Sequence, residues 1–253
     1  MKFSKKVALV TGSSQGIGKA IAIKLSENGY ITFITYLNNK LKGENTVKEI
    51  TKSGGKAVLV KLDVKSEESV KSVFEKVKND FGQLNVLVNN AGIVEVFKSI
   101  EGVSFKEWQD VVDTKINGNF LCTKYALPLM KNQENANVII IVSSLGERPD
   151  PDYPAYCIGT AGTIAFTKAM ALYLGRYGIR TNAIGPGTTK TIGMWDTFER
   201  NNDKMWNNFA KNNPMGRVST PKDIANATLM IINDESKFLN GNIIYMNGGS
   251  HLK

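Results

Sequence analysis

The stretch "KVALVTGSSQGIGKAIAIKLSENG", residues 6–29, decides the fold. It opens with a short apolar run that favours a β-strand, passes through a glycine-rich turn, and continues with apolar residues at helical spacing. Gly12, Gly16 and Gly18 lie in the turn. Glycine allows a tight bend there and lets backbone N–H groups approach a pyrophosphate at the positive end of the following helix. The stretch therefore predicts a strand, a phosphate-binding turn and a helix, although a purely structural turn has the same pattern.

The same alternation continues along the chain. The β-rich runs "ITFITYL", "KAVLVKLDV" and "NVLVNNAG" are separated by amphipathic helical segments such as "SVKSVFEKVKNDFG". We expect further helices at about 104–131 and 154–177, and later strands at "NVIIIVSS", "RTNAIGPG" and "NIIYMNGG". Repeated βαβ units of this kind indicate a parallel sheet with helices on both faces. The prediction is one α/β domain over 1–253, a Rossmann-type doubly wound sheet of seven mostly parallel strands.

Composition narrows the class of protein. The 253 residues are 42% hydrophobic and 22% charged, which suits one large globular domain. Because no apolar run approaches the ~20 residues of a membrane span, and the start lacks a signal-peptide core, we expect a cytoplasmic protein with no membrane partner. Cys122 and Cys157 lack zinc or disulfide-framework spacing, and His251 is the only histidine. No metal site or histidine-based triad is expected.

The formal charge of +9 favours anionic ligands without choosing among them. Lysines are spread along the helical segments at the spacing of a solvated face, with no dense basic block. Nucleic-acid binding is therefore not predicted.

Two hydroxyl groups suggest chemistry on a carbonyl. Ser143 ends the apolar run "NVIIIVSS", and Tyr156 stands at the start of the apolar helix that follows. A convergent serine and tyrosine can deliver a proton to a carbonyl oxygen. A free tyrosine, however, has a pKa of about 10 and needs a nearby positive charge to work near neutrality.

These motifs, in this order, resemble the short-chain dehydrogenase/reductase family from about Lys5 to Gly249. Its subgroups closest in pattern are the 3-oxoacyl-carrier-protein reductases and glucose-type dehydrogenases. The resemblance implies hydride transfer between a nicotinamide and a ketone or secondary alcohol. Ser143 would orient the carbonyl and Tyr156 would donate the proton. Expected cofactor-binding residues are Gly12, Ser14, Gln15, Gly16, Ile17, Gly18, Tyr36, Asn38, Asp63, Val64, Asn90, Ala91, Gly92, Tyr156, Pro186, Gly187 and Thr191.

The choice of dinucleotide depends on the end of the second strand. NAD-preferring relatives carry an acid there, whereas NADP-preferring ones place a basic residue nearby. Tyr36 occupies the acid's position. Because no carboxylate would repel a 2′-phosphate, and Asn38, Asn39 and Lys40 follow closely, NADP(H) is favoured over NAD(H).

The chain departs from the family at the active site. Thr160 stands where the family's YxxxK motif has its lysine, which normally holds the ribose and lowers the pKa of the tyrosine. Counted from Trp108 and Gly118, the family's asparagine on the preceding helix becomes Lys115. Asn117 would take that place only after a shift in register. Relative to the family pattern, a lysine is missing from the helix that carries Tyr156 and is present instead on the preceding helix, on the opposite side of the site.

Three hypotheses follow. Lys115 restores a cation beside Tyr156 while Thr160 keeps a hydrogen bond to ribose. Alternatively, the site is weakened and the protein is a catalytically silent dinucleotide-binding protein. In the third, Lys115 is a solvated or interface lysine, and Tyr156 works through Ser143 and the charge of the cofactor.

The sequence leaves two substrate classes and two oligomeric states open. Residues at about 188–216 carry tryptophans, phenylalanines and methionines where the family has its substrate lid, which suits an apolar substrate such as a 3-oxoacyl thioester. The charged stretch "GERPDPDYP", 146–154, suits instead a sugar or another polar ketone, or is a solvated loop. Apolar residues on several faces of the helices at 104–131 and 154–177 favour a homotetramer or homodimer.

Overall fold

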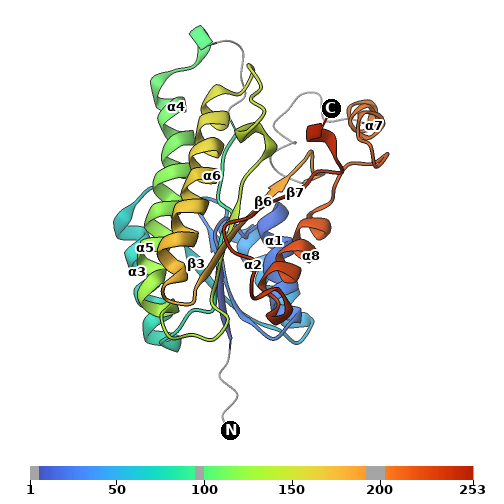
Figure 1. The fold of residues 1–253 in the computed structure, drawn as a ribbon. Helices are drawn as coiled ribbons and strands as arrows, with labels where there is room; N and C mark the ends of the chain where they lie inside the picture. Colours follow the sequence, from blue (N-terminus) through green and yellow to red (C-terminus); the bar gives the residue numbers. More distant parts are fainter. Residues whose placement is uncertain (1–5, 95–99, 192–202, 253) are drawn as a thin grey trace.

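One seven-stranded sheet organises the molecule (Figure 1). The computed structural model describes residues 6–94, 100–191 and 203–252. Its strands are β1 Val7–Val10, β2 Ile31–Tyr36, β3 Lys56–Lys61, β4 Val86–Asn89, β5 Asn137–Ile141, β6 Arg180–Pro186 and β7 Ile243–Met246. Their order in the sheet is β3-β2-β1-β4-β5-β6-β7, and every pairing of neighbours is parallel. This topology confirms the predicted Rossmann-type α/β fold.

Helices cover both faces of the sheet (Figure 1). The α-helices are α1 Gly16–Glu27, α2 Lys40–Lys52, α3 Glu67–Phe81, α4 Phe105–Val112, α5 Gly118–Met130, α6 Pro154–Gly175, α7 Asp203–Asn212 and α8 Pro221–Ile232. One buried cluster joins the sheet to α3, α5 and α6, and another joins it to α1 and α8. The strand order reverses between β1 and β4, and an open parallel sheet binds its ligands at such a point.

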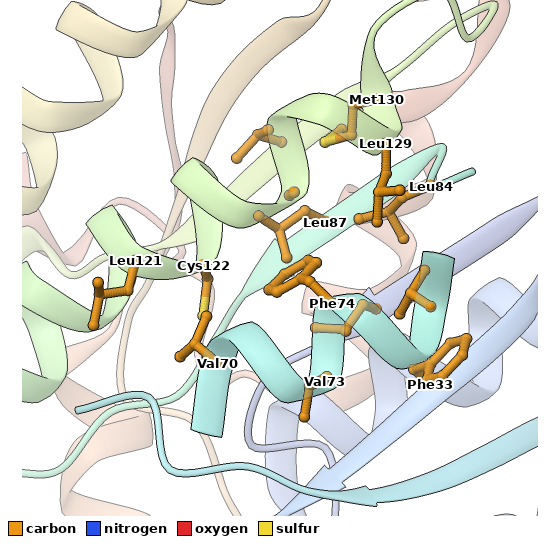
Figure 2. Close-up of a cluster of buried hydrophobic side chains, with 14 of the residues drawn as sticks. Phe33, Val70, Val73, Phe74, Leu84, Leu87, Leu121, Cys122, Leu129 and Met130 are labelled. Carbon is orange, nitrogen blue, oxygen red and sulfur yellow. The ribbon is translucent and has the colours of Figure 1, made fainter. Parts of the chain in front are cut away.

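The core between α3, α5 and the sheet is closely packed (Figure 2). Phe74 of α3 is 3% exposed and lies with Leu87 of β4 and Cys122 of α5. Complete burial raises the pKa of the Cys122 thiol to about 12, so this group stays neutral. Cys122 therefore packs as a small apolar side chain.

The helix predicted at 104–131 is divided in the structure. Between α4 and α5 lies a π-helical turn, η2, Asp113–Asn117. The backbone carbonyl of Lys115 in this turn accepts hydrogen bonds from the Asn119 amide and, at 3.3 Å, from the Thr163 hydroxyl of α6. Side chains that insert into a helical ladder in this way are a known cause of local distortion. The π turn also places Lys115 against α6.

Helix α6 is the long apolar helix of the fold. By length and hydropathy alone it could cross a membrane, and 44% of its most apolar window is buried inside the protein. It packs against β6, α4 and the short turn η3 Ser144–Gly146. Such an apolar composition is expected of a helix that packs against a sheet on one side and against other helices on its flanks.

Substitution Phe74→Ala should lower the free energy of unfolding by about 3–5 kcal/mol, because it leaves a cavity between α3, α5 and the sheet. Phe238 is fully exposed, so Phe238→Ala is the matched control and should change it by less than about 0.5 kcal/mol. Urea unfolding at one fixed protein concentration measures both. Equal effects of the two substitutions would contradict this packing.

Candidate active site

The glycine-rich turn between β1 and α1 is shaped by close backbone approaches. Gly12 and Gly16 have φ of +64° and +60°, a conformation that glycine adopts without strain. A Cβ atom on Gly18 would lie 2.4 Å from Nδ2 of Asn90 and 2.6 Å from the carbonyl oxygen of Gly12. Gly18 therefore has to be glycine for the turn to pack on the end of β4.

A hydrogen-bonded clasp joins that turn to the end of β4. The Thr11 hydroxyl accepts from the backbone N–H groups of Asn90 at 2.9 Å and Ala91 at 2.8 Å. The side-chain amide of Asn90 donates back to the carbonyls of Thr11 at 2.8 Å and Gly12 at 3.3 Å. Residues 11–18 and 89–92, which are far apart in the sequence, thus form one surface at the switch point.

The N-terminus of α1 is left open to a ligand. Its N-cap residue, Gln15, makes no side-chain capping bond, and its first turn holds no acidic residue. The N-caps of α2, α3, α4 and α8 do accept such bonds, through Asn39, Ser66, Ser104 and Thr220. Uncapped N–H groups at a positive helix end are suited to a pyrophosphate. These residues therefore fit the dinucleotide that the sequence predicts.

Other predicted cofactor residues lie at the ends of strands. Tyr36 ends β2, with Asn38 exposed just beyond it, and Asp63 and Val64 follow β3. An oxygen of Asp63 accepts from the N–H of Lys65 at 3.0 Å, so the carboxylate also shapes its own turn. Pro186 ends β6, and the Thr191 side chain lies 3.8 Å from where a Cβ on Gly16 would stand. Thr191 therefore lies against the glycine-rich turn.

Ser143 and Tyr156 come from adjoining elements. Ser143 follows β5, which lies between β4 and β6, and its hydroxyl accepts from the N–H of Leu145 at 3.3 Å. Tyr156 is half-buried in the first turn of α6, and the η3 segment that begins just after Ser143 packs against this helix. Both hydroxyl-bearing residues thus stand at the carboxyl edge of the sheet.

Lys115 reaches the tyrosine. Its side chain is 3% exposed, and its Nζ lies 4.6 Å from the centroid of the Tyr156 ring. The aliphatic part passes Gly159, where a Cβ would stand 3.1 Å from Cβ of Lys115. Its Cε and Nζ lie 3.3 Å from where a Cβ on Gly92 would be. The ammonium group therefore sits between the end of β4 and Tyr156, and the hypothesis of a solvated Lys115 is wrong.

The positions of Asn117 and Thr160 show how the chain around Lys115 aligns with the family pattern. Asn117 is exposed and donates to Asp113 at 2.7 Å, so it does not share the position of Lys115. Thr160 is completely buried, and its hydroxyl has no hydrogen-bond partner. Its predicted hydrogen bond to a ribose stays a prediction.

On α4, hydrogen bonds from Lys65 at 2.6 Å and Lys106 at 3.1 Å hold the pKa of Asp110 below its ordinary value.

The loop at 146–154 is tied to the C-terminal part of the chain. Arg148 donates to the backbone carbonyl of His251, and an oxygen of Asp150 accepts from the N–H of Asp152 at 2.9 Å. These charged groups therefore have local structural partners. Of the predicted lid, 192–202 lies outside the described residues. The rest includes α7, where Trp206 is 7% exposed with Nζ of Lys190 5.6 Å from its ring.

One functional contact could not be anticipated from the sequence: a 2.6 Å hydrogen bond from Nζ of Lys42, on α2, to Oε1 of Gln15 in the glycine-rich turn. The space for Lys115 beside Gly159 did have a signal in the sequence, because glycine in the middle of an apolar helix costs helix stability and needs a packing reason. Within the described ranges, no cluster of histidine, cysteine or acidic residues could hold a metal.

Comparisons with known proteins agree with this geometry. Residues 12–251 match the family described as "Enoyl-(Acyl carrier protein) reductase". The chain is 34% identical to the 3-oxoacyl-(acyl-carrier-protein) reductase FabG of Staphylococcus aureus, over 100% of both chains. It is also 34% identical to glucose 1-dehydrogenase 2 of Bacillus subtilis, over 98% of this chain and 95% of that one.

Solved structures give the same result. A dehydrogenase/reductase from Sinorhizobium meliloti superposes with a TM-score of 0.89 at 28% identity, over 98% of this chain and 96% of the other. A mutant short-chain dehydrogenase/reductase from Serratia marcescens also has a TM-score of 0.89, at 25% identity, over 99% of this chain and all of the other. The nucleotide-binding turn, the parallel sheet and these full-length matches lead to one conclusion: this chain belongs to the short-chain dehydrogenase/reductase family and is an oxidoreductase of the nicotinamide-dependent kind.

Proposed function

We propose that the protein reduces a ketone to a secondary alcohol with NADPH, with Tyr156 as the proton donor and Lys115 as the cation that assists it. One observation carries the proposal: the Lys115 ammonium lies 4.6 Å from the Tyr156 ring centroid in a site whose family lysine is absent. A 3-oxoacyl thioester is the favoured substrate class, supported by the 34% identity to FabG and by the apolar residues in the sequence of the expected lid.

Each side chain has a separate task in this mechanism. When bound, the nicotinamide ring supplies the hydride for reduction. The Ser143 hydroxyl orients and polarises the carbonyl, and the Tyr156 hydroxyl gives its proton to the oxygen that becomes the alcohol. A cation close to the phenol ring stabilises the phenolate that remains. Lys115 performs this task from η2, opposite the usual position on α6.

The local sequence makes room for such a lysine. Gly159 leaves space for the aliphatic part of Lys115, and Gly92 leaves space for its ammonium group. Thr160, one turn after Tyr156, has a short side chain that leaves the region beside the phenol free for the ammonium. Two glycines and a short residue around one buried lysine support a relocated cation better than the loss of the site.

The remaining assignments follow from the same site. NADP(H) is favoured over NAD(H) because β2 ends at Tyr36 without a carboxylate. We assign 1–253 to one domain in the cytoplasm, with a substrate lid at about 188–216. A sugar or another polar ketone is the second substrate class, supported by the 34% identity to glucose 1-dehydrogenase 2.

Turnover tests the proposal directly. With NADPH and a panel of 3-oxoacyl thioesters, diketones and sugars, the protein should oxidise the cofactor, and Tyr156→Phe should remove most of this activity because the proton donor is lost. Absorbance of the reduced nicotinamide follows the reaction. Calorimetric binding of the cofactor without turnover above the Tyr156→Phe level would favour the alternative, a silent dinucleotide-binding protein.

Substitution Lys115→Met should lower turnover by roughly 10²-fold or more and move the pH–activity profile to higher pH, because the phenolate loses its cation. Lys115→Asn should act similarly, and adding Thr160→Lys to it should recover activity by rebuilding the family arrangement. Cofactor binding, measured in parallel, separates catalysis from folding. Full activity of Lys115→Met would overturn the role given to this lysine.

Assembly into a dimer or tetramer is the expected quaternary state. Helices α4, α5 and α6 lie together on one side of the sheet (Figure 1). Large apolar side chains of these helices are exposed, among them Phe105, Phe120, Ile158 and Leu172. The partner that fits this apolar layer is a second copy of the chain, whose symmetric surface would cover it.

Light scattering at micromolar concentration should therefore report a particle larger than the 27.8 kDa chain. The double substitution Phe120→Glu with Leu172→Glu should reduce the size, because it places charges in the apolar contact. Phe238→Glu, on an exposed residue outside these helices, is the control and should leave the size unchanged. A monomeric wild-type protein would contradict the expectation.

A further inference from the structure

The first turns of α2 are attached to the glycine-rich turn. Nζ of Lys42 donates to Oε1 of Gln15 at 2.6 Å, and the Thr46 hydroxyl donates to the carbonyl of Ser14 at 3.2 Å. Asn39, the N-cap of α2, accepts from the backbone N–H of Lys42 at 3.0 Å. Lys42 therefore stands where the end of β2 meets the dinucleotide-binding turn, which is the side of the fold that recognises the adenosine ribose.

The charge of Lys42 is not neutralised by the residues around it. Neighbouring lysines have carboxylate partners: Lys40 pairs with Glu44 at 3.4 Å, and Lys19 pairs with Glu49 at 2.7 Å. Within the described part of the chain, Lys42 makes no ion pair, and its acceptor is the neutral amide of Gln15. An ammonium group has three donor hydrogens, so a single amide leaves donors for an anion.

Burial and surroundings favour an anionic ligand at this position. Lys42 is half-buried, whereas Lys40 is exposed over 65% of its side chain. A partly buried cation is screened less by salt than an exposed one, and its interaction with an anion is correspondingly stronger. The nearby end of β2 carries Tyr36, Leu37 and Asn38, none of which is acidic.

We propose that Lys42, held in place by Gln15, is the residue that recognises the 2′-phosphate of NADP(H) and so determines the choice of dinucleotide. The inference rests on the proposed function, since it assigns a specificity residue within the cofactor site. It also changes the expectation from the sequence, in which Lys40 was the basic residue nearest to the end of β2. Lys40 is exposed and pairs with Glu44, so the partly buried Lys42, which makes no ion pair among the described residues, is favoured over it.

Binding of adenosine fragments tests the proposal without any turnover. Calorimetry with 2′,5′-ADP and with 5′-ADP compares a ligand that has the 2′-phosphate with one that lacks it. Lys42→Ala should weaken 2′,5′-ADP by about tenfold or more and leave 5′-ADP nearly unchanged, because a charge-assisted hydrogen bond is lost. Lys40→Ala is the matched control on the same helix and should leave both affinities nearly unchanged. Lys42→Arg should retain the preference.

The outcomes separate this inference from the function on which it rests. Equal weakening of both ligands by Lys42→Ala would show that Lys42 only holds α2 in place, and no change in either would exclude a contact; each result overturns the proposal. Wild-type protein that binds both fragments equally also overturns it, while leaving the dinucleotide site intact. Wild-type protein that binds neither fragment, nor NADPH or NADH, would overturn the proposed function itself.

Discussion

The clasp between Thr11 and Asn90 is the constraint on which the site depends. Its four hydrogen bonds hold the glycine-rich turn against the end of β4, at the point where the strand order reverses. Gly18 permits the approach because a side chain there would overlap Asn90. The N-terminus of α1 follows directly from the turn that is held in this way. Gly92, just after β4, lies beside the Lys115 ammonium group. A change in the clasp would therefore displace the dinucleotide and catalytic halves of the site together.

Much of the fold could be predicted from the sequence because the central strands are covered on both faces. Such strands are continuous apolar runs, and β1 and β4 are buried along their whole length. The positions of Ser143 and Tyr156 followed from the order of the motifs. The π turn and the bond between Lys42 and Gln15 could not be predicted in this way. Both depend on where two helices meet in space, and neither leaves a periodic pattern in the residues that take part.

Under the proposed function, the reaction tolerates a different placement of its positive charge, on Lys115. A phenol responds to the distance of a cation and to the dielectric around it, and not to which helix carries the lysine. Burying an ammonium group is costly unless a partner compensates for it. Here the face of the Tyr156 ring, 4.6 Å from Nζ, provides part of that compensation. The backbone carbonyl of Lys115, bonded to Asn119 and Thr163, keeps the turn that carries the lysine in position.

The uncapped N-terminus of α1 has a consequence for the energetics of the whole chain. A capping side chain usually stabilises a helix by about 1 kcal/mol, and α1 does without one. The donors that a cap would satisfy are therefore available to an anion, and a bound anion would add to the stability of the folded state. Ligand at a hundred times its dissociation constant adds about 2.7 kcal/mol by mass action. Protein without a bound dinucleotide would therefore unfold more readily than protein that holds one.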